Sequence, residues 1–437
     1  MRRHGSAATT LTIEPGERLS AAAVAVAARE GYHGLTVGGV ARGAGVSRTT
    51  FYCHFTDKDS CLLAGYRERV SDLRDCLAEA VSGIPPAERP RALLEGLLGW
   101  LSADPDAARL LLVEAPAASP EIREEHQRTL AAIERLLEAS ASAGAGPPLA
   151  VPATALLGGV LGVLAIRVLD GEGRQLQELG EELLAWVESY RCPQGQGPRG
   201  GNYWAQLGRR FPPAPAHPLE PVRLLPRGRH ALPGATAAMA RRSRILAAFV
   251  RLSARSEYGS ITVADISAEA RVTRATFYSH FRGKEEAFLA AQTEAMQQSV
   301  ALTAAQYSLT TGWPDGIWLA LDALLGHLSR EPELARLGLL GALAAGEKAI
   351  RNSYRNQRAH ALFLEDGYRL GGDDAAPTRL TSEAVPAAVA ALMRHHLLAG
   401  QSNMRWLLPV ASCTVLAPFL GAAAALEFIE ARCQTAR

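Results

Sequence analysis

The sequence predicts an all-α protein built from two related units. Three observations support this fold class: helix-forming residues dominate, alternating β-branched runs are absent, and one half of the chain resembles the other. The 437 residues are 48 % hydrophobic and 21 % charged, which is typical of chains that fold. At about 150 residues per domain, this length suggests roughly three domains.

The internal repeat is clearest around a short motif. The sequence LTVGGVARGAGVSRTTFYCHFTDK at 35–58 aligns with ITVADISAEARVTRATFYSHFRGK at 261–284, and about half of the positions are identical. A weaker match continues downstream, where residues 97–110 resemble residues 324–337. The repeat therefore occupies about half of the chain, and we expect two copies of one unit rather than an array of short repeats.

A change in composition separates the two copies. The segment Cys192–Ala235 holds nine of the 25 prolines, six arginines and a single acid, Glu220. This composition is typical of a flexible or polyproline-like linker, although its charge could also touch nucleic acid and Tyr203 and Trp204 could dock it on a folded unit. The expected domains are a first helix-turn-helix domain at 1–60, a first helical effector and dimerisation domain at 61–191, the linker at 192–240, a second helix-turn-helix domain at 241–287 and a second helical domain at 288–437.

The expected elements follow in order from helix signals. An amphipathic helix at Glu17–Glu30 ends at Gly31, and Thr36 and Ser47 stand where N-caps belong, as Thr262 and Thr273 do in the second copy. Two short helices, Val37–Ala44 and Arg48–Phe55, flank a break at Gly45, which is the spacing of a helix-turn-helix. Longer helices are predicted at Arg91–Leu101, Pro120–Ala139, Val151–Val168, Gln175–Tyr190, Ile317–Ser329 and Ala344–Leu364, with two more after Ser382.

The second short helix of each copy has one face suited to burial and others suited to DNA. Phe51 and Phe55 are four residues apart and share the apolar face. Arg48 and Tyr52 share another face, so a cation and a phenol can meet phosphates and base edges. Such aromatic runs are more often core packing. The repeat favours a contact role, because only three of the 46 basic residues are lysines and two of these, Lys58 and Lys284, occupy matching positions.

The motif Thr-Val-x-x-Val/Ile-Ala/Ser, followed by Ala-x-Val-Ser/Thr-Arg-x-Thr-Phe-Tyr-x-His-Phe-x-x-Lys, resembles the DNA-binding segment of TetR-family transcriptional regulators. The resemblance implies a three-helix DNA-binding domain, a larger helical domain that binds a small and often apolar effector, and dimerisation through the last two helices of that domain. It also implies phosphate contacts by Arg18, Tyr52, His54 and Lys58 and by Arg244, Tyr278, His280 and Lys284. Base-reading or groove-edge positions would be Arg48, Thr49, Arg274 and Ala275. The full set of candidate DNA-binding residues adds Ser47, Thr50, Arg271, Thr273 and Thr276.

Two positions differ between the copies in a way that affects the backbone. Gly45 in the turn is replaced by Arg271, which would cost on the order of 1 kcal/mol if the site needs a positive φ, although the arginine could add a phosphate contact. Gly38 and Gly39 stand in the supporting helix of copy one, where copy two has Ala264 and Asp265. We call the helix-turn-helix domains at 1–60 and 241–287 the first and second reading heads, or head one and head two. Two interior glycines weaken a helix by roughly 1–2 kcal/mol, so the first reading head is expected to be less rigid than the second.

Charge and cysteine usage exclude several other classes. Lys+Arg 46 against Asp+Glu 44 excludes a basic nucleic-acid-binding tail but not a local basic face. The six scattered cysteines favour neither disulfides nor zinc, and the N-terminus lacks a secretion signal, so a cytoplasmic location is expected. The uncharged stretch Trp406–Leu426 contains two prolines and is interpreted as a buried helix pair broken near them, not as a membrane span.

The sequence contains no paired carboxylates with an identifiable role, no nucleophile with a matching base and no metal-ligand spacing, so neither an enzyme nor a cofactor is expected. We expect a sequence-specific repressor that an unknown, small, apolar effector releases from double-stranded DNA. Trp100, His126 and His327 could line the effector site or simply belong to the core. The two halves could pair within the chain on an imperfect palindrome, or each could pair with its counterpart in a homodimer. In a further alternative, one copy serves only as a dimerisation or interaction module.

Overall fold

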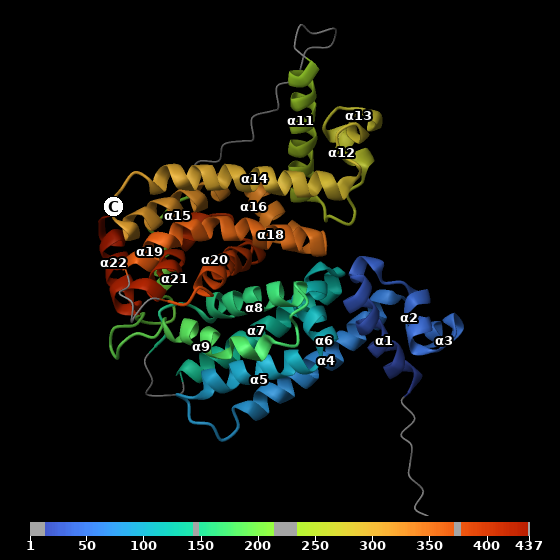
Figure 1. Ribbon diagram of the computed structural model, residues 1–437, viewed down its shortest axis with the longest axis horizontal. Coiled ribbons are helices and arrows are strands. Elements are labelled where there is room, and N and C mark those ends of the chain that lie inside the picture. Colours follow the sequence, from blue (N-terminus) through green and yellow to red (C-terminus); the bar gives the residue numbers. More distant parts are fainter. Residues whose placement is uncertain (1–13, 143–147, 214–233, 371–376, 436–437) are drawn as a thin grey trace, which may run out of the picture.

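The computed structural model describes residues 14–142, 148–213, 234–370 and 377–435. Within these ranges the regular structure is helical, apart from one isolated bridge between Leu149 and Arg191. The prediction of an all-α fold with two units is confirmed (Figure 1). The first unit and the segment that follows it form ten α-helices: α1 (Pro15–Glu30), α2 (Val37–Ala44), α3 (Arg48–His54), α4 (Lys58–Ala80), α5 (Arg89–Ala103), α6 (Pro105–Arg109), α7 (Pro120–Ser142), α8 (Ala153–Leu169), α9 (Gly180–Glu188) and α10 (Tyr203–Gly208).

The second unit repeats this order with small additions. Its described helices are α11 (Gly234–Arg255), α12 (Val263–Glu269), α13 (Arg274–Tyr278), α14 (Lys284–Tyr307), α15 (Trp313–Arg330), α16 (Pro332–Arg336), α17 (Ala342–Ala344), α18 (Glu347–His360), α19 (Glu365–Leu370), α20 (Thr381–Leu398), α21 (Leu408–Leu420) and α22 (Ala422–Thr435). The starts of corresponding helices stay in register along the chain. Lys58 and Lys284 are 226 residues apart, and Ala153 and Thr381 are 228 apart.

Corresponding helices of the two units pack on each other at the centre of the molecule. Helix α8 lies along its counterpart α20 (Figure 1). A Cβ atom added to Gly158 would stand 2.1 Å from Cβ of Ala391, and one added to Gly162 would stand 2.4 Å from Cβ of Ala387. Both approaches are shorter than real Cβ contacts, so α8 can come this close to α20 only with glycine at Gly158 and Gly162.

The apolar core follows the same division. One continuous cluster of buried side chains runs from Leu19 in α1 through both larger helical domains to Cys433 in α22. The second helix-turn-helix has its own cluster, which is built around Phe249, Phe277 and Phe288. The first helix-turn-helix therefore shares the main core, whereas the second packs in a smaller cluster that also takes in Leu334, Leu337 and Ala349 of the larger domain.

The first part of the predicted linker is ordered and packed. Tyr203, in α10, is buried and donates a hydrogen bond from its hydroxyl to Glu430 at 2.8 Å. The ring of Phe211 meets Trp318, and Arg210 donates to the carbonyl of Cys433 at 2.7 Å. The expectation of a solvated spacer is therefore wrong for Cys192–Pro213, where the aromatic residues dock the segment on the second unit. Residues 214–233 lie outside the described ranges.

Some helix boundaries differ from the sequence prediction. The helix expected at Ala344–Leu364 begins only at Glu347, because Gly346 takes a positive φ of 89°. Three helices, not two, follow Ser382 or include it. In the uncharged stretch, α21 contains Pro418 in its last turn and the break falls at Gly421, where φ is 83°. No helix among the described residues is long and apolar enough to cross a membrane.

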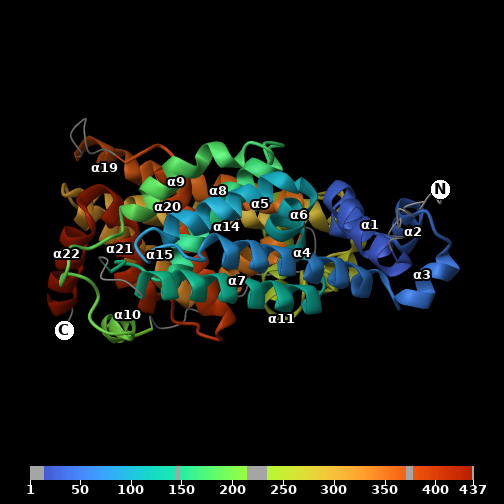
Figure 2. The ribbon, with the colours of Figure 1, turned by 90° about the horizontal axis from the view of Figure 1, so that it is seen from below.

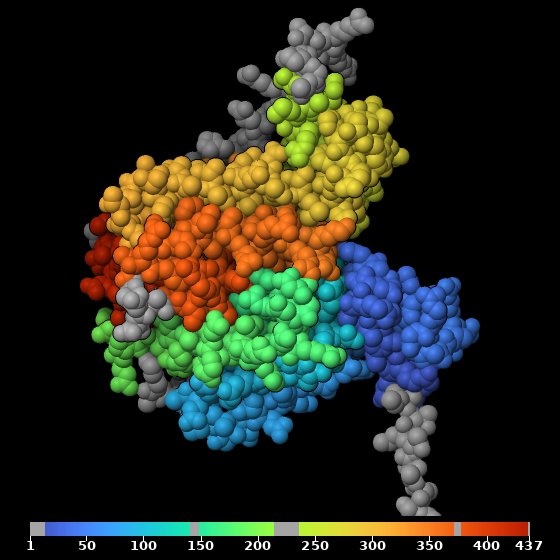
Figure 3. Space-filling view, in the orientation of Figure 1, coloured from blue at the N-terminus to red at the C-terminus, as the bar shows by residue number. Residues whose placement is uncertain are grey.

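Both helix-turn-helix domains lie toward the same end of the body: in Figure 3 the blue one projects to the right and the yellow one rises at the upper right. In the view from below, α1, α2 and α3 extend beyond the end of the helical body (Figure 2). Helix α11 is longer than α1, with 22 residues against 16, and its first turns protrude from the body (Figure 1).

Candidate nucleic-acid interface

Local capping builds the first helix-turn-helix, in which α3 is the second helix. Thr36 accepts a hydrogen bond from the backbone N–H of Gly39 and starts α2, and Ser47 accepts one from Thr50 and starts α3. Between them Gly45 takes a left-handed conformation with φ of 66°. Phe51 is fully buried against the other helices of the domain, so the remaining faces of α3 turn outward.

The second copy reaches the same geometry with a different turn residue. Thr262 forms a capping box with Asp265, and Thr273 accepts a hydrogen bond from Thr276. Arg271 has a φ of 52° and is the one non-glycine residue with positive φ among the described residues. The site therefore does need a positive φ, and the second copy carries the strain that Gly45 avoids in the first.

The outward residues of α3 and α13 are available to a ligand. Tyr52 is 60 % exposed and Tyr278 is 57 % exposed, although both are large aromatic side chains. Arg48, Thr49 and His54 are also exposed on α3, as are Arg274 and Ala275 on α13. These faces combine cations, a hydroxyl and phenols, which can pair with phosphate oxygens and base edges.

The threonines one turn into each recognition helix have a local role. The hydroxyl of Thr50 lies 2.9 Å from that of Ser47, and the hydroxyl of Thr276 lies 2.9 Å from that of Thr273. In both copies the pair closes the first turn of the helix. Ser47 and Thr273 are exposed, so the caps remain open to solvent on their outer side.

The two matching lysines hold the turn that precedes the helix-turn-helix. Lys284 donates to the carbonyls of Tyr258, Gly259 and Ile261 at 3.0, 3.2 and 3.1 Å, and its ammonium lies 4.5 Å from the centre of the Tyr258 ring. Burial lowers the pKa of Lys284. Lys58 makes fewer contacts. It donates one hydrogen bond of 3.5 Å to the carbonyl of Tyr32, and its ammonium lies 4.6 Å from the centre of the Tyr32 ring. In the free protein both ammonium groups are thus engaged with the backbone, a role that the sequence did not indicate.

The two arginines near the start of the domains differ in their contacts. Arg18 is exposed and donates to the carbonyl of Ala44 at the end of α2, next to the turn at Gly45. Its counterpart Arg244 is partly buried, and its Nε has no hydrogen-bond partner among the described residues. The guanidinium of Arg48 lies over Gly38, where an added Cβ would be 2.7 Å from Nη2. The glycine in α2 therefore lets Arg48 fold back onto the supporting helix.

The second copy also has a basic cluster, formed by Arg241, Arg242 and His280, that was not predicted from the sequence. Burial lowers the pKa of His280, and the nearby charges of Arg241 and Arg242 lower it further. Arg242 also lies over the Phe281 ring, 5.5 Å from its centre. The run Arg241-Arg242-Ser243-Arg244 was the available signal, since it places three arginines in one turn of α11. His54, in the first copy, lies instead above Gly16 at the start of α1.

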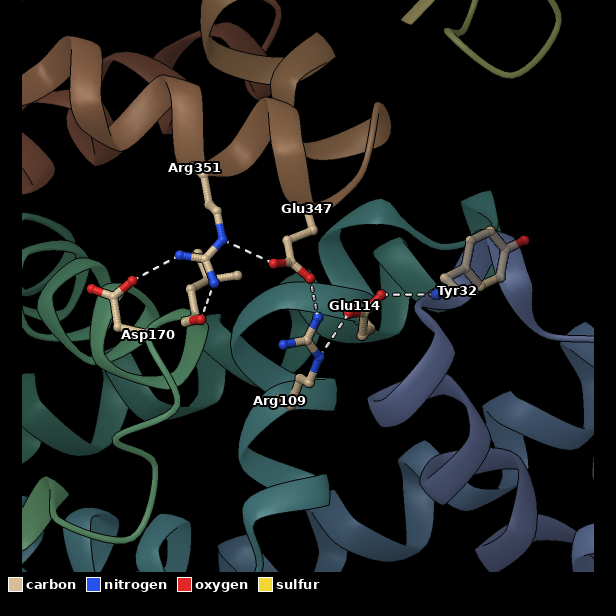
Figure 4. Close-up of polar contacts among 7 residues, drawn as sticks. Tyr32, Arg109, Glu114, Asp170, Glu347 and Arg351 are labelled. Carbon is tan, nitrogen blue, oxygen red and sulfur yellow. Dashed lines mark hydrogen bonds and ion pairs between the residues drawn. The ribbon is translucent and has the colours of Figure 1, made fainter.

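Polar contacts tie the first helix-turn-helix to the second unit (Figure 4). Glu114 accepts a hydrogen bond from the backbone N–H of Tyr32 and pairs with Arg109, which pairs in turn with Glu347 of α18. Glu347 also pairs with Arg351, which continues to Asp170 at 2.7 Å. These contacts connect the turn between α1 and α2 to the opposite half of the chain.

The two capped helices, the left-handed turn between them and the exposed polar face of the second helix together define a helix-turn-helix DNA-binding protein. Residues 19–64 and 245–291 both match the family model described as bacterial regulatory proteins, tetR family. The chain therefore carries two TetR-type helix-turn-helix segments in tandem, one at the start of each unit. A comparison with the curated proteins finds no match.

Three solved structures are similar to less than half of this chain and to nearly the whole of their own. The fatty acid degradation regulator FadR from Bacillus halodurans is 20 % identical with a TM-score of 0.36, covering 43 % of this chain and 96 % of its own. FadR from Bacillus subtilis in complex with stearoyl-CoA is 19 % identical with a TM-score of 0.34, covering 39 % and 96 %. A TetR-family regulator from Marinobacter aquaeolei VT8 is 20 % identical with a TM-score of 0.34, covering 41 % and 98 %.

Proposed function

We propose that the chain is a repressor that binds one DNA duplex with both reading heads, as a pseudo-dimer formed within a single chain. The observation that carries this proposal is the packing of α8 on its counterpart α20. Contact between equivalent helices is the geometry of a two-fold dimer interface, and here both partners belong to one polypeptide.

The two heads would read different half-sites of an imperfect palindrome. Thr49 and Cys53 face outward on α3, and the second copy has Ala275 and Ser279 at these positions. Side chains that differ at the groove change the preferred bases, so the halves of the operator should not be identical. Arg18, Arg48, Tyr52, His54 and Lys58 of head one are the proposed DNA contacts. Their counterparts in head two are Arg244, Arg274, Tyr278, His280 and Lys284, with Arg271 as an added phosphate contact.

A cavity in the second helical domain suits a small apolar effector. It has a volume of about 150 Å³ and lies between α14, α15, α18 and α20. Most of its lining is aliphatic, with Leu321 and Leu324 as examples. In this lining, polar atoms of Asn356, Gln357 and His360 are buried and have no hydrogen-bond partner among the described residues. An effector with an apolar body and one polar group would satisfy them.

Binding of the effector would release DNA if it favours an orientation of the two heads that does not fit the operator. The cavity lies on α20, the helix that packs on unit one, so an occupant could shift the two units relative to each other. Relief of repression by a small molecule follows from this arrangement as part of the proposal.

A second candidate keeps one head as an interaction module only. Two differences in head two favour it: the strained backbone at Arg271 and the inward position of Arg244, which leaves its guanidinium partly buried. In that case the other head would bind DNA in a dimer of two chains.

Footprinting of operator DNA with two double variants separates these functions. Arg48→Ala/Tyr52→Ala removes contacts of head one, and Arg274→Ala/Tyr278→Ala removes those of head two, with the exposed Arg174→Ala as the control. The pseudo-dimer predicts that each double variant loses one half of the footprint and lowers the salt dependence of binding. Loss with one double variant alone indicates a degenerate head, and loss with neither refutes DNA reading by these helices.

Sedimentation of the DNA-bound protein tests the pairing. One chain per operator is expected for the pseudo-dimer. Two chains per operator would instead show that each unit pairs with its counterpart on a second molecule.

A further inference from the structure

A second and larger cavity, of about 760 Å³, lies between the two units. Unit one contributes residues of α7 and α8 to its wall, and unit two contributes residues of α18, α20 and the turn that follows α11. Its volume falls in the range of pockets that hold small organic ligands. The aliphatic part of the lining includes Leu157, Leu161 and Leu340.

Arg394 of α20 lies in this cavity without a counter-charge. It is partly buried, and no carboxylate of the described residues lies within ion-pair distance of it. Burial lowers the pKa of Arg394, as expected for a guanidinium that has lost water and gained no anion. Its charge also reaches His126 across the cavity, where it adds to the effect of burial in lowering the pKa of that imidazole to about 4.

The rest of the lining does not neutralise this charge. Arg336 corresponds to Arg109 of unit one, but the position of Glu114 is taken in unit two by Gly341, so the partner carboxylate is missing. Glu257 is engaged by Arg123 at 2.5 Å. Glu134 is the remaining acidic residue of the lining, and burial raises the pKa of its carboxyl, an effect that the charge of His395 opposes. The lining therefore has one carboxylate outside the Arg123 pair, that of Glu134, against the three arginines Arg255, Arg336 and Arg394.

A guanidinium that is partly withdrawn from water and lacks a counter-charge is costly to the folded state. Such a group is compensated when an oxyanion binds it, because a charge-assisted bidentate pair replaces the lost hydration. The same cavity offers leucine side chains that would cover an apolar body. Arg394 is well placed for this, since it stands one turn beyond Ala391, at the crossing of α8 and α20.

We propose that the cavity between the units is a binding site for an amphipathic organic anion, whose carboxylate or phosphate head pairs with Arg394 while its apolar body lies against the leucines of α8 and unit two. This site differs from the smaller cavity between α14, α15, α18 and α20, with which it shares Gln357 of the lining. Anion binding at this site does not require DNA, so an experiment can test the site independently of the proposed repressor function.

Calorimetric titration of the full chain without DNA tests the site, with decanoate, decanol and decyltrimethylammonium as probes. We expect decanoate to bind and the cationic probe not to bind. Arg394→Met should weaken decanoate binding by about 10-fold or more, Arg394→Lys should retain part of it, and Arg174→Met should leave it unchanged. Equal decanoate affinity in wild type and Arg394→Met, or decanol binding as tight as decanoate, would overturn the proposal.

Thermal unfolding gives a second readout that does not depend on measuring affinity. Without ligand, Arg394→Met should raise Tm by at least about 1 °C, because it removes an unpaired charge from a partly buried site. With decanoate present, the wild type should gain Tm and the variant should not. A fall in Tm of the unliganded variant would show that Arg394 serves the fold, and would refute its assignment to a ligand.

Discussion

The buried carboxylate of Glu114 accepts a hydrogen bond of 2.8 Å from the backbone N–H of Tyr32, across 82 residues of sequence. Glu114 is 3 % exposed and also forms an ion pair of 3.2 Å with Arg109. It therefore anchors the turn between α1 and α2 to the body. The equivalent position in unit two is Gly341, so the second helix-turn-helix lacks this carboxylate anchor.

Replacing Glu114 by glutamine should destabilise the protein. The amide oxygen can still accept from Tyr32, but the ion pair with Arg109 is lost inside the protein, so we expect a loss of about 1–3 kcal/mol in the free energy of unfolding. Urea denaturation measures it. The control Glu95→Gln, at an exposed pair with Arg91, should change stability by no more than about 0.5 kcal/mol. A stable Glu114→Gln would contradict the anchoring role.

Even a methyl group should disturb the contact between the units. Gly158→Ala places Cβ 2.1 Å from Cβ of Ala391, so α8 and α20 must move apart, and we expect a cost of about 1–3 kcal/mol. Adding Ala391→Gly should recover most of this loss, because it removes the opposing Cβ. A double variant no more stable than Gly158→Ala in thermal unfolding would show that the clash is not between these two residues.

Stability should fall as the pH falls below about 6.5. Burial lowers the pKa of His126 and of His360 to about 4, so the folded state resists protonation that the unfolded chain accepts at 6.5. The stabilising contribution is complete above pH 6.5 and is lost as the pH falls towards 4, by on the order of 2 kcal/mol per histidine at pH 5. Urea midpoints at pH 7.5 and 5 measure it. His126→Gln should reduce the pH dependence, and an unchanged slope would contradict the assignment.

The strained turn of head two can be relieved. Arg271→Gly should stabilise the protein by about 1 kcal/mol, since glycine adopts positive φ without strain, whereas Gly45→Ala should destabilise it by a similar amount. Chemical denaturation compares the two. If Arg271 contacts phosphate, Arg271→Gly will also weaken operator binding although the protein is more stable. Arg271→Gly that is less stable than wild type would argue against strain at this residue.

Lys284 should contribute more than Lys58 to the free energy of unfolding. Lys284 donates to three carbonyls and Lys58 to one, so Lys284→Met should cost about 1–2 kcal/mol and Lys58→Met about half as much. Hydrogen exchange at the turns 32–35 and 258–261 would locate the loss. Equal effects of both substitutions would mean that the carbonyl bonds of Lys284 contribute little.

The reading heads were largely predictable because their signals are local. Thr36, Ser47, Thr262 and Thr273 each directly precede a helix and accept a hydrogen bond from the backbone N–H three residues later, and a pattern this short is visible in the sequence. The positive φ at position 45 was expected from glycine, and the structure confirms that Arg271 shares it. The softness expected of the first head from its two glycines stays a prediction. The clamp formed by Lys58 and Lys284 was not predictable, because the carbonyls that they bind carry no signal in side-chain identity.

The sequence by itself determined the all-α class, the duplication and the two helix-turn-helix motifs, since periodicity, capping and repetition are properties of neighbouring residues. Only the tertiary structure decided that Gly158 meets Ala391, that the linker docks through Tyr203, and that Arg394 faces a cavity. These contacts join residues more than 200 positions apart. Before folding, a glycine pair on a helix or an arginine on an apolar face is compatible with many partners, and the packing of two particular surfaces selects one.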